Sequence, residues 1–447
     1  MTAEAIVMNR SAVALAADSA VTIGGAERAK TFESANKLFE LIKGSNIGVM
    51  IYSNAEINGT PWETVLKTFR RDHATFQASH VEDYFDTFRK YLAEHDKLLK
   101  PDDETAPIMR ISMWLFGYVF DWLEKYPGRL TTANDVVIKK AVRQAVSEFC
   151  ESWENELEKQ NDIADLVDRA ALKYRRQFGD TVKQYAEYSF ADLPITAPLI
   201  NRLVRLVFTF LTKEIRTPLD SGLVFAGFGT EDYFPKMVCG RVSARLQSDL
   251  IVHERESAEV TVAEPAHLQT FAQDDPARGW IEGISKEVRA EIQTHWTNWV
   301  GTLPRHLRRE LKTNTNISLD PSQARELEKI TFKLAREQLH EFFQYMHDYE
   351  QHNFKEPMLS SISLLPKDEL GLLAESLVNI TSLKQRMSIF DANTVGGAID
   401  VALISIGDGF VWLNRKHYFK PELNPTWHLT HGARIAVDQN GVTEEAQ

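Results

Sequence analysis

The sequence predicts an α+β fold, a single sandwich of sheets and helices that carries large helical insertions. Strand-forming stretches occur at three separated places along the 447 residues, and two long segments of helical periodicity lie between them. Strands that complete one core only after long helical excursions favour one interrupted sandwich over a row of independent domains. With 43% hydrophobic and 26% charged residues, the composition is that of an ordinary globular chain able to bury a large core.

The first strand-rich segment covers residues 2–60 and forms the first part of the predicted core. Ala5 to Ala17 predicts two strands joined by a turn at Asn9-Arg10-Ser11. Lys37 to Leu41 alternates between apolar and polar residues, as a strand with one exposed face does. Ile47 to Tyr52 is a continuous apolar run, which is typical of a strand buried on both faces.

Changes between strand-like and helical periodicity of the apolar residues set the remaining predicted boundaries. From Trp62 onward apolar residues recur at helical spacing, and this period continues to about residue 216. Near the C-terminus, Lys367 to Met387 predicts a helix, and a strand pair turns at Gly407-Asp408-Gly409. The expected units are a helical insertion that includes the first core helices (61–216), the second-sheet strands of the core (217–285), a second helical insertion (286–355), the final core helix and hairpin (356–420) and a C-terminal tail (421–447).

Composition and charge exclude several classes of function. The chain has 51 Lys and Arg against 63 Asp and Glu, a net charge of −12, so it lacks the basic surface that nucleic-acid binding needs. The densest apolar stretch, Met109 to Trp122, contains Arg110 and is too short to span a bilayer. The N-terminus has no basic segment followed by an apolar one, as a signal peptide would. We expect a cytoplasmic protein that binds neither nucleic acid nor membrane.

The sequence predicts no metal and no cofactor. His340, His347 and His352 lie on a predicted helix without an HExxH motif, which indicates surface positions rather than a zinc site. No phosphate loop of the form GxxxxGK[ST] occurs. Cys150 and Cys239 are too far apart in sequence for a metal-ligand motif, and we expect both to be small buried hydrophobes.

Thr2 is the first candidate for chemistry. Its side chain is small enough for methionine aminopeptidase to remove Met1, which would leave Thr2 with a free α-amine beside its own hydroxyl. A hydroxyl needs a base to accept its proton before it attacks a carbonyl carbon. A terminal α-amine, with a pKa of about 7.7–8.0, can serve as that base near neutral pH. Threonine after methionine is common, so the hypothesis depends on the residues that follow.

Those residues resemble a known family. The segment TAEAIVMNRSAVALAADSAVTIG is similar to the start of a proteasome β-subunit, and to that of the bacterial proteasome-like threonine peptidase that works with an ATP-dependent unfoldase. The spacing from Thr2 to Asp18 matches the family, and Lys37 in NKLFEL matches the family lysine after a longer loop. SGLVFAGFG and the segment from Leu365 to Leu413 resemble the family's second-sheet strand, final helix and last hairpin. The chain is thereby identified as a divergent member with large helical insertions.

The resemblance implies a four-layer αββα sandwich, the fold of N-terminal nucleophile hydrolases, and a set of catalytic residues. Lys37 would stabilise the alkoxide of Thr2. Asp18 would supply the counter-charge that keeps a partly buried lysine ionised. Asp391 and Thr394 fall where the family has residues that position the terminal threonine. Either they hold the α-amine, or they only form the turn that follows them.

Two departures from the family pattern affect the pocket. In the family, the backbone N–H that binds the oxyanion comes from a glycine. Here that position falls at Tyr52-Ser53, with Met50 as a further pocket residue, and a tyrosine would narrow the space. The segment from His267 to Gly283 lacks the Gly-Ser turn whose serine touches the α-amine in the family.

The leading hypothesis is a threonine-type peptidase that cleaves amide bonds through a Thr2 acyl-enzyme, without metal or cofactor. The resemblance implies a peptide or protein substrate, further copies of the chain and an ATP-dependent unfoldase as partners. Two alternatives stay open. One is a catalytically silent scaffold or regulatory binding protein, and the other is a small-molecule amidase whose pocket the helical insertions shape.

Overall fold

The structure is a computed structural model that describes residues 3–23, 30–126, 135–164, 166, 169–273, 275–314, 317, 319–387, 396–417, 419, 423 and 424. Three predicted site residues, Thr2, Asp391 and Thr394, lie outside the described residues, and so does most of the predicted tail. Within the described part of the chain, no helix combines the length and the apolar composition needed to cross a bilayer.

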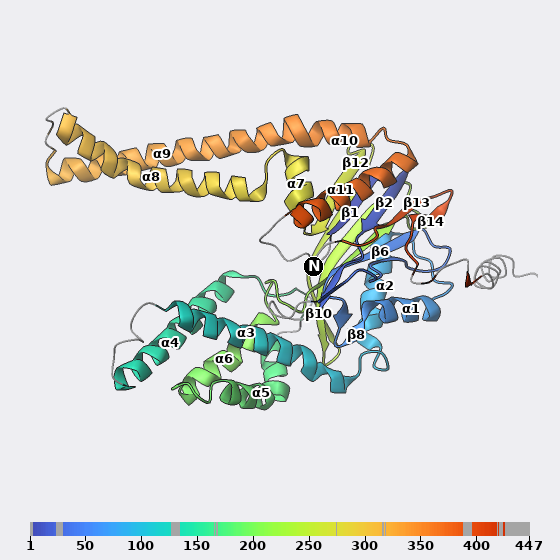
Figure 1. The fold of residues 1–447 in the computed structure, drawn as a ribbon, viewed down its shortest axis with the longest axis horizontal. Coiled ribbons are helices and arrows are strands. Elements are labelled where there is room, and N and C mark those ends of the chain that lie inside the picture. The colour runs from blue at the N-terminus through green and yellow to red at the C-terminus, as the bar shows by residue number, and fades with distance from the viewer. Residues whose placement is uncertain are drawn as a thin grey trace, which may run out of the picture.

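Two five-stranded antiparallel sheets form the centre of the molecule (Figure 1). The first sheet has the order β12-β1-β2-β13-β14, formed by Ala266–Ala272, Ala3–Asn9, Ala12–Ala17, Asp400–Ser405 and Gly409–Asn414. The second sheet has the order β11-β10-β9-β6-β5, formed by Asp249–Glu259, Lys236–Leu246, Ser221–Gly227, Ile47–Ser53 and Leu38–Glu40. Two short pairs are separate: β3 (Val21–Ile23) with β4 (Lys30–Phe32), and β7 (Glu56–Ile57) with β8 (Thr60–Pro61). The predicted α+β class is confirmed.

The β1–β2 hairpin forms where the sequence predicts it. Its strands pair from Glu4 with Ala17 to Asn9 with Ala12. The turn is closed by the Asn9 side chain, whose Oδ1 accepts from the backbone N–H of Ser11 over 2.9 Å. Asparagine favours such a turn because its short side chain reaches the backbone two residues ahead.

One strand of residues 217–285 belongs to the first sheet rather than to the second, which corrects the predicted unit. β12 pairs with β1 along its whole length, from Ala3 with Ala272 to Asn9 with Ala266. After β11 the chain turns at Thr261, whose N–H donates to the carbonyl of Glu264 over 2.9 Å, and passes from one sheet to the other. Local periodicity shows that a strand forms, but not which sheet edge it joins.

Side chains of β1 and β2 alternate between two cores, so both strands are buried along their whole length. On one face, Ile6 and Leu15 pack against Met50 and Val224 of the second sheet. On the other face, the helices α10 (Glu356–Ile362) and α11 (Lys367–Met387) cover the first sheet. The predicted final helix is therefore confirmed at its predicted bounds.

Two helices cover the outer face of the second sheet. α1 (Trp62–Asp72) and α2 (Val81–Glu94) bury their apolar stripes against residues that include Val49, Ile51 and Phe225. The packing order is helices, sheet, sheet, helices. Because β6 is covered on both faces, its sequence has no polar alternation until Tyr52.

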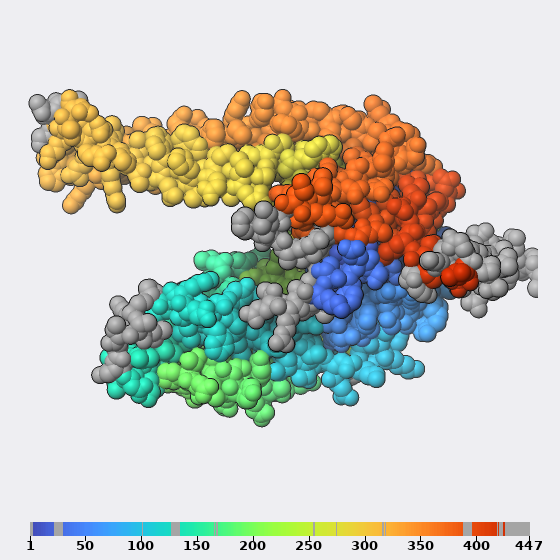
Figure 2. All heavy atoms as spheres, viewed as in Figure 1, coloured from blue at the N-terminus to red at the C-terminus, as the bar shows by residue number. Residues whose placement is uncertain are grey.

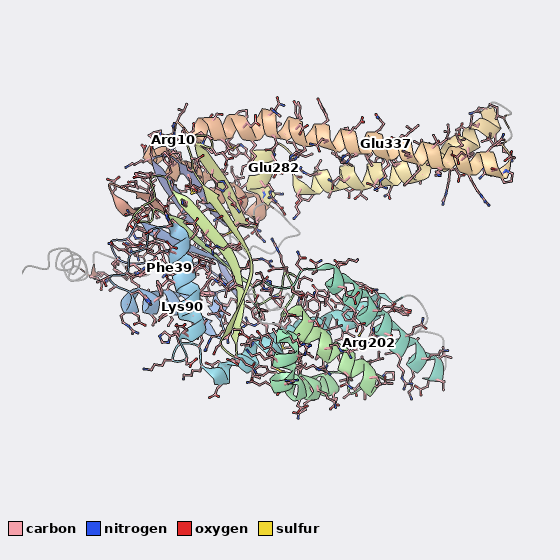
Figure 3. All side chains as sticks on the ribbon, turned by 180° about the vertical axis from the view of Figure 1, so that it is seen from behind. Arg10, Phe39, Lys90, Arg202, Glu282 and Glu337 are labelled. Carbon is pink, nitrogen blue, oxygen red and sulfur yellow. The ribbon has the colours of Figure 1, made fainter. Side chains whose placement is uncertain are left out.

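A helical bundle with its own core follows α2. It contains a short 3-10 helix, η1 (Pro101–Glu104), and the helices α3 (Thr105–Lys125), α4 (Asp135–Lys159), α5 (Ala170–Ser189) and α6 (Ala197–Phe210). Arg202 of α6, labelled in Figure 3, lies in this bundle. Its guanidinium donates to both carboxylate oxygens of Glu154 and to the hydroxyl of Ser147, both on α4, and so connects the two helices. The bundle core reaches the sheet through Ala244, Leu246 and Ile251, at the end of the β10–β11 hairpin.

The second helical segment is a long hairpin. After α7 (Asp275–Glu282), α8 (Lys286–Asn314) and α9 (Pro321–Glu350) run antiparallel, and a π-helical turn, η2 (Gln351–Lys355), leads into α10. An ion pair between Arg308 and Glu328, 3.2 Å apart, joins the two helices far from the sheets. Asp320 caps α9 by accepting from the N–H groups of Ser322 and Gln323.

The bundle α3–α6 and the hairpin α8–α9 project from the same side of the sheets (Figure 1). Figure 2 shows that the surface is hollowed between these two bodies. The N-terminal end of β1 lies at the base of this space. The first described residue of the chain is thus placed where two large helical insertions flank it.

Candidate active site

Asp18 directly follows β2 and accepts four hydrogen bonds from residues that the structure describes. The N–H of Ala3 donates to Asp18 Oδ1 over 3.2 Å, and the Lys37 ammonium donates to the same oxygen over 2.6 Å. The N–H of Gly396 donates to Asp18 Oδ2 over 3.0 Å, and that of Ala20 over 3.4 Å. One carboxylate therefore joins the start of β1, the residue before β5 and the segment that leads into β13.

Lys37 is held in place by the edge of the second sheet. Its carbonyl accepts from the N–H of Ile51 in β6 over 2.9 Å, immediately before β5 begins at Leu38. The side chains of Lys37 and Asp18 are only 8% and 1% exposed. Burial lowers the pKa of the Lys37 ammonium, and the charge and hydrogen bond of Asp18 oppose this effect. Lys37 and Asp18 thus form a desolvated ion pair, in which the ionised form of each side chain is stabilised by the opposite charge of the other.

The segment after the predicted residues Asp391 and Thr394 is anchored beside Asp18. Ser19 donates its N–H to the carbonyl of Gly396 over 3.3 Å and its hydroxyl to the carbonyl of Ala398. Gly397 has a φ of +77°, and a Cβ there would lie 2.8 Å from the hydroxyl oxygen of Ser19. Only glycine fits that backbone and that space. The described end of this loop is therefore fixed against the ion pair.

Met50, Tyr52 and Ser53 face three different environments. Met50 is fully buried between the sheets, so it is a core residue. The ring of Tyr52 lies over Gly222 of β9, where a Cβ would come within 1.9 Å of it, and stacks on Phe271 of β12 at 5.4 Å. Burial raises the pKa of the Tyr52 phenol. Ser53 is exposed and has a φ of +69°, which ends the regular strand.

Glu4 is a charged residue of this region that the sequence analysis missed. It is 2% exposed, and neither carboxylate oxygen has a hydrogen-bond partner among the described residues. Because side chains alternate along a strand, Glu4 lies on the same face of β1 as Ile6 and Met8, whose side chains point between the two sheets. Extending the predicted first strand from Ala5 back to Ala3 would have shown a carboxyl group at an inward position.

No family model matches the chain, and no curated protein matches it. Among solved structures, it is similar to a Gly-1 mutant of Anbu from Hyphomicrobium sp. strain MC1, with 8% identity and a TM-score of 0.25 over 100% of both chains. It is also similar to Anbu (ancestral beta-subunit) from Yersinia bercovieri, with 10% identity and a TM-score of 0.26, covering 99% of this chain and 100% of that chain. Anbu from Hyphomicrobium sp. strain MC1 gives 9% identity and a TM-score of 0.23 over 99% and 100%. Likenesses at these scores carry no argument about this chain.

These findings correct the family assignment made from the sequence. No family model or curated protein places the chain with proteasome β-subunits or with the bacterial proteasome-like threonine peptidases. The three solved structures described above are Anbu proteins, and their identities do not exceed 10%. Short motifs in a shared order were the basis of the assignment, and each motif is weak because strands and glycine turns recur in unrelated proteins.

A second polar cluster lies at the junction with the helical bundle. His253 Nε2 lies 2.6 Å from the hydroxyl oxygen of Ser243, which donates to Asp220 over 2.7 Å, and Arg241 also donates to Asp220 over 2.8 Å. Glu214 lies 3.5 Å from His253 Nδ1. Because the proton of Ser243 is directed to Asp220 and not to the imidazole, the histidine does not activate the serine as a nucleophile. Ser243 and His253 are 4% and 2% exposed, so the cluster is structural.

This cluster predicts a loss of stability at acid pH. Burial lowers the pKa of His253, while Asp220 and Glu214 raise it and Arg241 lowers it further. Between the lowered pKa of the folded state and about pH 6.5, the folded state therefore binds fewer protons than the unfolded state, so stability falls as pH decreases, by at most about 1.4 kcal/mol per pH unit. Urea unfolding between pH 7 and pH 5 should show this slope in the wild type and not in His253→Gln. His340→Gln, at an exposed position of α9, should keep it.

Two surface depressions lie away from the ion pair. One of about 660 Å³ is lined by residues that include His73 after α1, Tyr91 of α2 and His95 after α2. Another of about 600 Å³ is lined by residues that include Arg169 and Lys173 of the bundle. Volume alone would favour a site there, whereas the buried ion pair and the lowered pKa of Lys37 favour the candidate site at Asp18 and Lys37. Within the described residues, no group of three or more His, Cys, Asp or Glu could hold a metal ion.

Proposed function

We propose that this protein is an N-terminal nucleophile hydrolase that cleaves amide bonds, and peptide bonds in particular, through an acyl-enzyme on Thr2. The observation that carries the proposal is the bond from the Ala3 N–H to Asp18, because the same carboxylate oxygen binds the Lys37 ammonium. The backbone nitrogen of Ala3, which follows Thr2 in the chain, is thereby linked through Asp18 to the buried ammonium of Lys37. The sheet and helix packing supports the sandwich architecture of such enzymes.

The first half of the reaction uses groups that this arrangement supplies. Once Met1 is removed, the α-amine of Thr2 accepts the hydroxyl proton, and the oxygen attacks the carbonyl carbon of the substrate. Lys37 stabilises the developing oxygen anion because its own charge is held by Asp18 in a water-poor site. The carbon–nitrogen bond then breaks, the leaving amine takes the proton from the α-amine, and an ester on Thr2 remains. Water attacks the ester and releases a carboxylic acid.

The backbone of β6 offers a donor for the oxyanion. Ile51 points its N–H at the carbonyl of Lys37, on the edge of β6 that faces β5. N–H groups alternate between the two edges of a strand, so the N–H of Ser53 belongs to the same edge as that of Ile51, beyond the start of β5. The absence of glycine there does not remove the donor, because every residue except proline carries a backbone N–H.

Tyr52 and the two helical bodies bear on the substrate class. The hollow between α3–α6 and α8–α9 lies on the side of the sheets where β1 begins, and an extended peptide would need such a space beside Thr2. The Tyr52 ring, stacked on Phe271, occupies space between the sheets and favours small side chains beside the reacting carbonyl. The same ring favours the second candidate, a small-molecule amidase. A ring of subunits and an unfoldase are not needed for this chemistry.

The proposal is tested by intact mass before and after treatment with a peptide epoxyketone, on protein expressed with an unmodified N-terminus. This reagent forms its ring adduct only where a hydroxyl and a free α-amine belong to the same residue. We expect complete loss of Met1 and one adduct that maps to Thr2. Turnover of unfolded protein separates a peptidase from an amidase that accepts only small amides.

Thr2→Ala is the matched control because it also permits removal of Met1. It should form no adduct and should lose amide hydrolysis by about 10³-fold or more. Retention of Met1 in nearly all wild-type molecules would exclude catalysis by Thr2. Full biological activity of Thr2→Ala would favour the scaffold alternative.

A further inference from the structure

Glu4 occupies an inward position of β1, one residue after the nitrogen that binds Asp18. Its neighbours across the first sheet are Ala17 of β2 and Phe271 of β12. The carboxyl group is 2% exposed, and both oxygens are buried without a hydrogen-bond partner in the described part of the chain. A buried polar group normally finds a partner, because leaving it unpaired costs free energy. Its retention at this place therefore needs an explanation.

The groups that act electrostatically on Glu4 lie on both sheets. Asp18 directly follows Ala17, the β2 residue that pairs with Glu4, and Lys37 precedes β5 in the second sheet. Tyr52 of β6, whose phenol is affected by the charge of Glu4, stacks on Phe271, the β12 residue that pairs with Glu4. Lys37 faces Asp18, Glu4 and the more distant Lys416, whose ammonium is itself paired with Asp400. Glu4 is thus a second carboxyl group of the lysine site, on the opposite sheet from the lysine.

Electrostatics decides the state of this carboxyl group. Burial raises the pKa of Glu4 well above its usual value, the charge of Asp18 raises it further, and the charge of Lys37 lowers it. An ionised Glu4 would leave the buried site with two anions and one cation. A neutral Glu4 leaves it with one pair, Asp18 and Lys37, and no net charge. Burial, the largest effect, and the charge of Asp18 therefore both favour the protonated carboxyl group.

We propose that Glu4 is a positioning residue of the Thr2 site, which acts through Lys37 by holding a proton beside it. While Glu4 is neutral, Lys37 is balanced by Asp18 alone and its field reaches the oxygen of Thr2. When Glu4 loses its proton to water at higher pH, Lys37 faces two anions and stabilises the reacting oxygen less. This role rests on the proposed function, and Glu4→Gln separates it from packing because the amide has the same shape and cannot ionise.

The first readout is the pH dependence of unfolding, which does not need catalysis. The pKa of Glu4 is higher in the folded state, so the stability that its neutral form contributes is complete below about pH 4.5 and is lost as pH rises. In urea unfolding from pH 5 upward, the unfolding constant of the wild type should rise about tenfold per pH unit relative to Glu4→Gln. Glu256→Gln, at an exposed position that also faces Tyr52, should behave as the wild type. Parallel curves for the wild type and Glu4→Gln would overturn the neutral state of Glu4.

The second readout is the pH profile of amide hydrolysis. In the wild type, ionisation of Glu4 and loss of the Lys37 proton should each contribute to the alkaline limb of kcat/KM. In Glu4→Gln the contribution of Glu4 should disappear and only that of Lys37 should remain, while the acid limb, set by the α-amine of Thr2, should not move. An unchanged alkaline limb would overturn the positioning role and leave Glu4 as a packing residue. If Glu4→Gln does not fold, Glu4→Leu offers the same test with an apolar side chain.

A third readout keeps the inference distinct from the proposed function. If the wild type hydrolyses no amide, the proposed function fails. The pKa of Lys37 still tests whether Glu4 is electrostatically coupled to it. Nuclear magnetic resonance of lysine labelled with carbon-13 at Cε follows this pKa directly. Glu4→Gln should lower it, because the Glu4 anion favours the ammonium. An equal Lys37 pKa in both proteins would overturn the coupling.

Discussion

Replacing Asp18 by alanine should lower the free energy of unfolding by about 3–5 kcal/mol. The substitution leaves the Lys37 ammonium, which is 8% exposed, without its counter-charge. It also removes the acceptor for the N–H groups of Ala3 and Gly396, which hold the start of β1 and the segment before β13. Urea unfolding at pH 7, followed by tryptophan fluorescence, measures the change.

Two variants make this prediction specific. Asp18→Asn keeps one oxygen acceptor and loses the charge, so its loss of stability should be smaller than that of Asp18→Ala. Asp408→Ala breaks a pair with Lys367 that has the same length, 2.6 Å, with side chains 43% and 56% exposed, and should change stability far less than Asp18→Ala does. A loss below 1 kcal/mol for Asp18→Ala would contradict a desolvated ion pair.

Replacing Lys37 by methionine should reduce amide hydrolysis by about 10²–10⁴-fold and should destabilise the fold less than Asp18→Ala does. Methionine fills a similar space without a charge, so the proposed reaction loses the cation that would stabilise the oxygen of Thr2. Asp18 stays partly satisfied, because its carboxylate still accepts from the N–H groups of Ala3, Ala20 and Gly396. The rate of epoxyketone labelling of Thr2 and kcat/KM for a peptide amide measure the loss.

Lys43→Met is the matched control for this substitution. Lys43 follows β5, is 57% exposed and pairs with Glu40 over 2.8 Å, away from Asp18. Its replacement should leave labelling and hydrolysis at the wild-type rate. Equal labelling of wild type and Lys37→Met would remove Lys37 from the mechanism, whatever the stability of the variant.

Local patterns predicted many of the elements well. The β1–β2 hairpin, α11 and the β13–β14 hairpin form at or near their predicted residues, because turn chemistry at Asn9 and at Gly407 to Gly409 and the periodicity of Lys367 to Met387 are local signals. The predicted second-sheet unit, in contrast, contained β12, which joins the first sheet. Sheet membership depends on pairing partners that lie far away in sequence, and periodicity contains no information about them.

The candidate site was predicted unevenly. Asp18 and Lys37 were named from the sequence, and the structure brings their charges to 2.6 Å. Glu4 was missed because the predicted first strand began at Ala5, which hid its inward parity. Tyr52 was expected to narrow a pocket, whereas its stacking on Phe271 and its place over Gly222 depend on two strands from other parts of the chain. The roles of Thr2, Asp391 and Thr394 remain predictions.

Short-range chemistry accounts for where strands and helices begin and end, and for the α+β class, since turn residues and apolar spacing act over a few neighbouring residues. Which strands join each sheet and which helices cover it depend on tertiary contacts. Lys37 becomes buried only because β5, β6 and the end of β2 meet around it. Burial is the decisive difference. Lysine, aspartate and glutamate are residue types that usually lie at the surface, so the sequence alone does not distinguish Lys37, Asp18 and Glu4. Once they are buried away from water, the charge of each one affects the others.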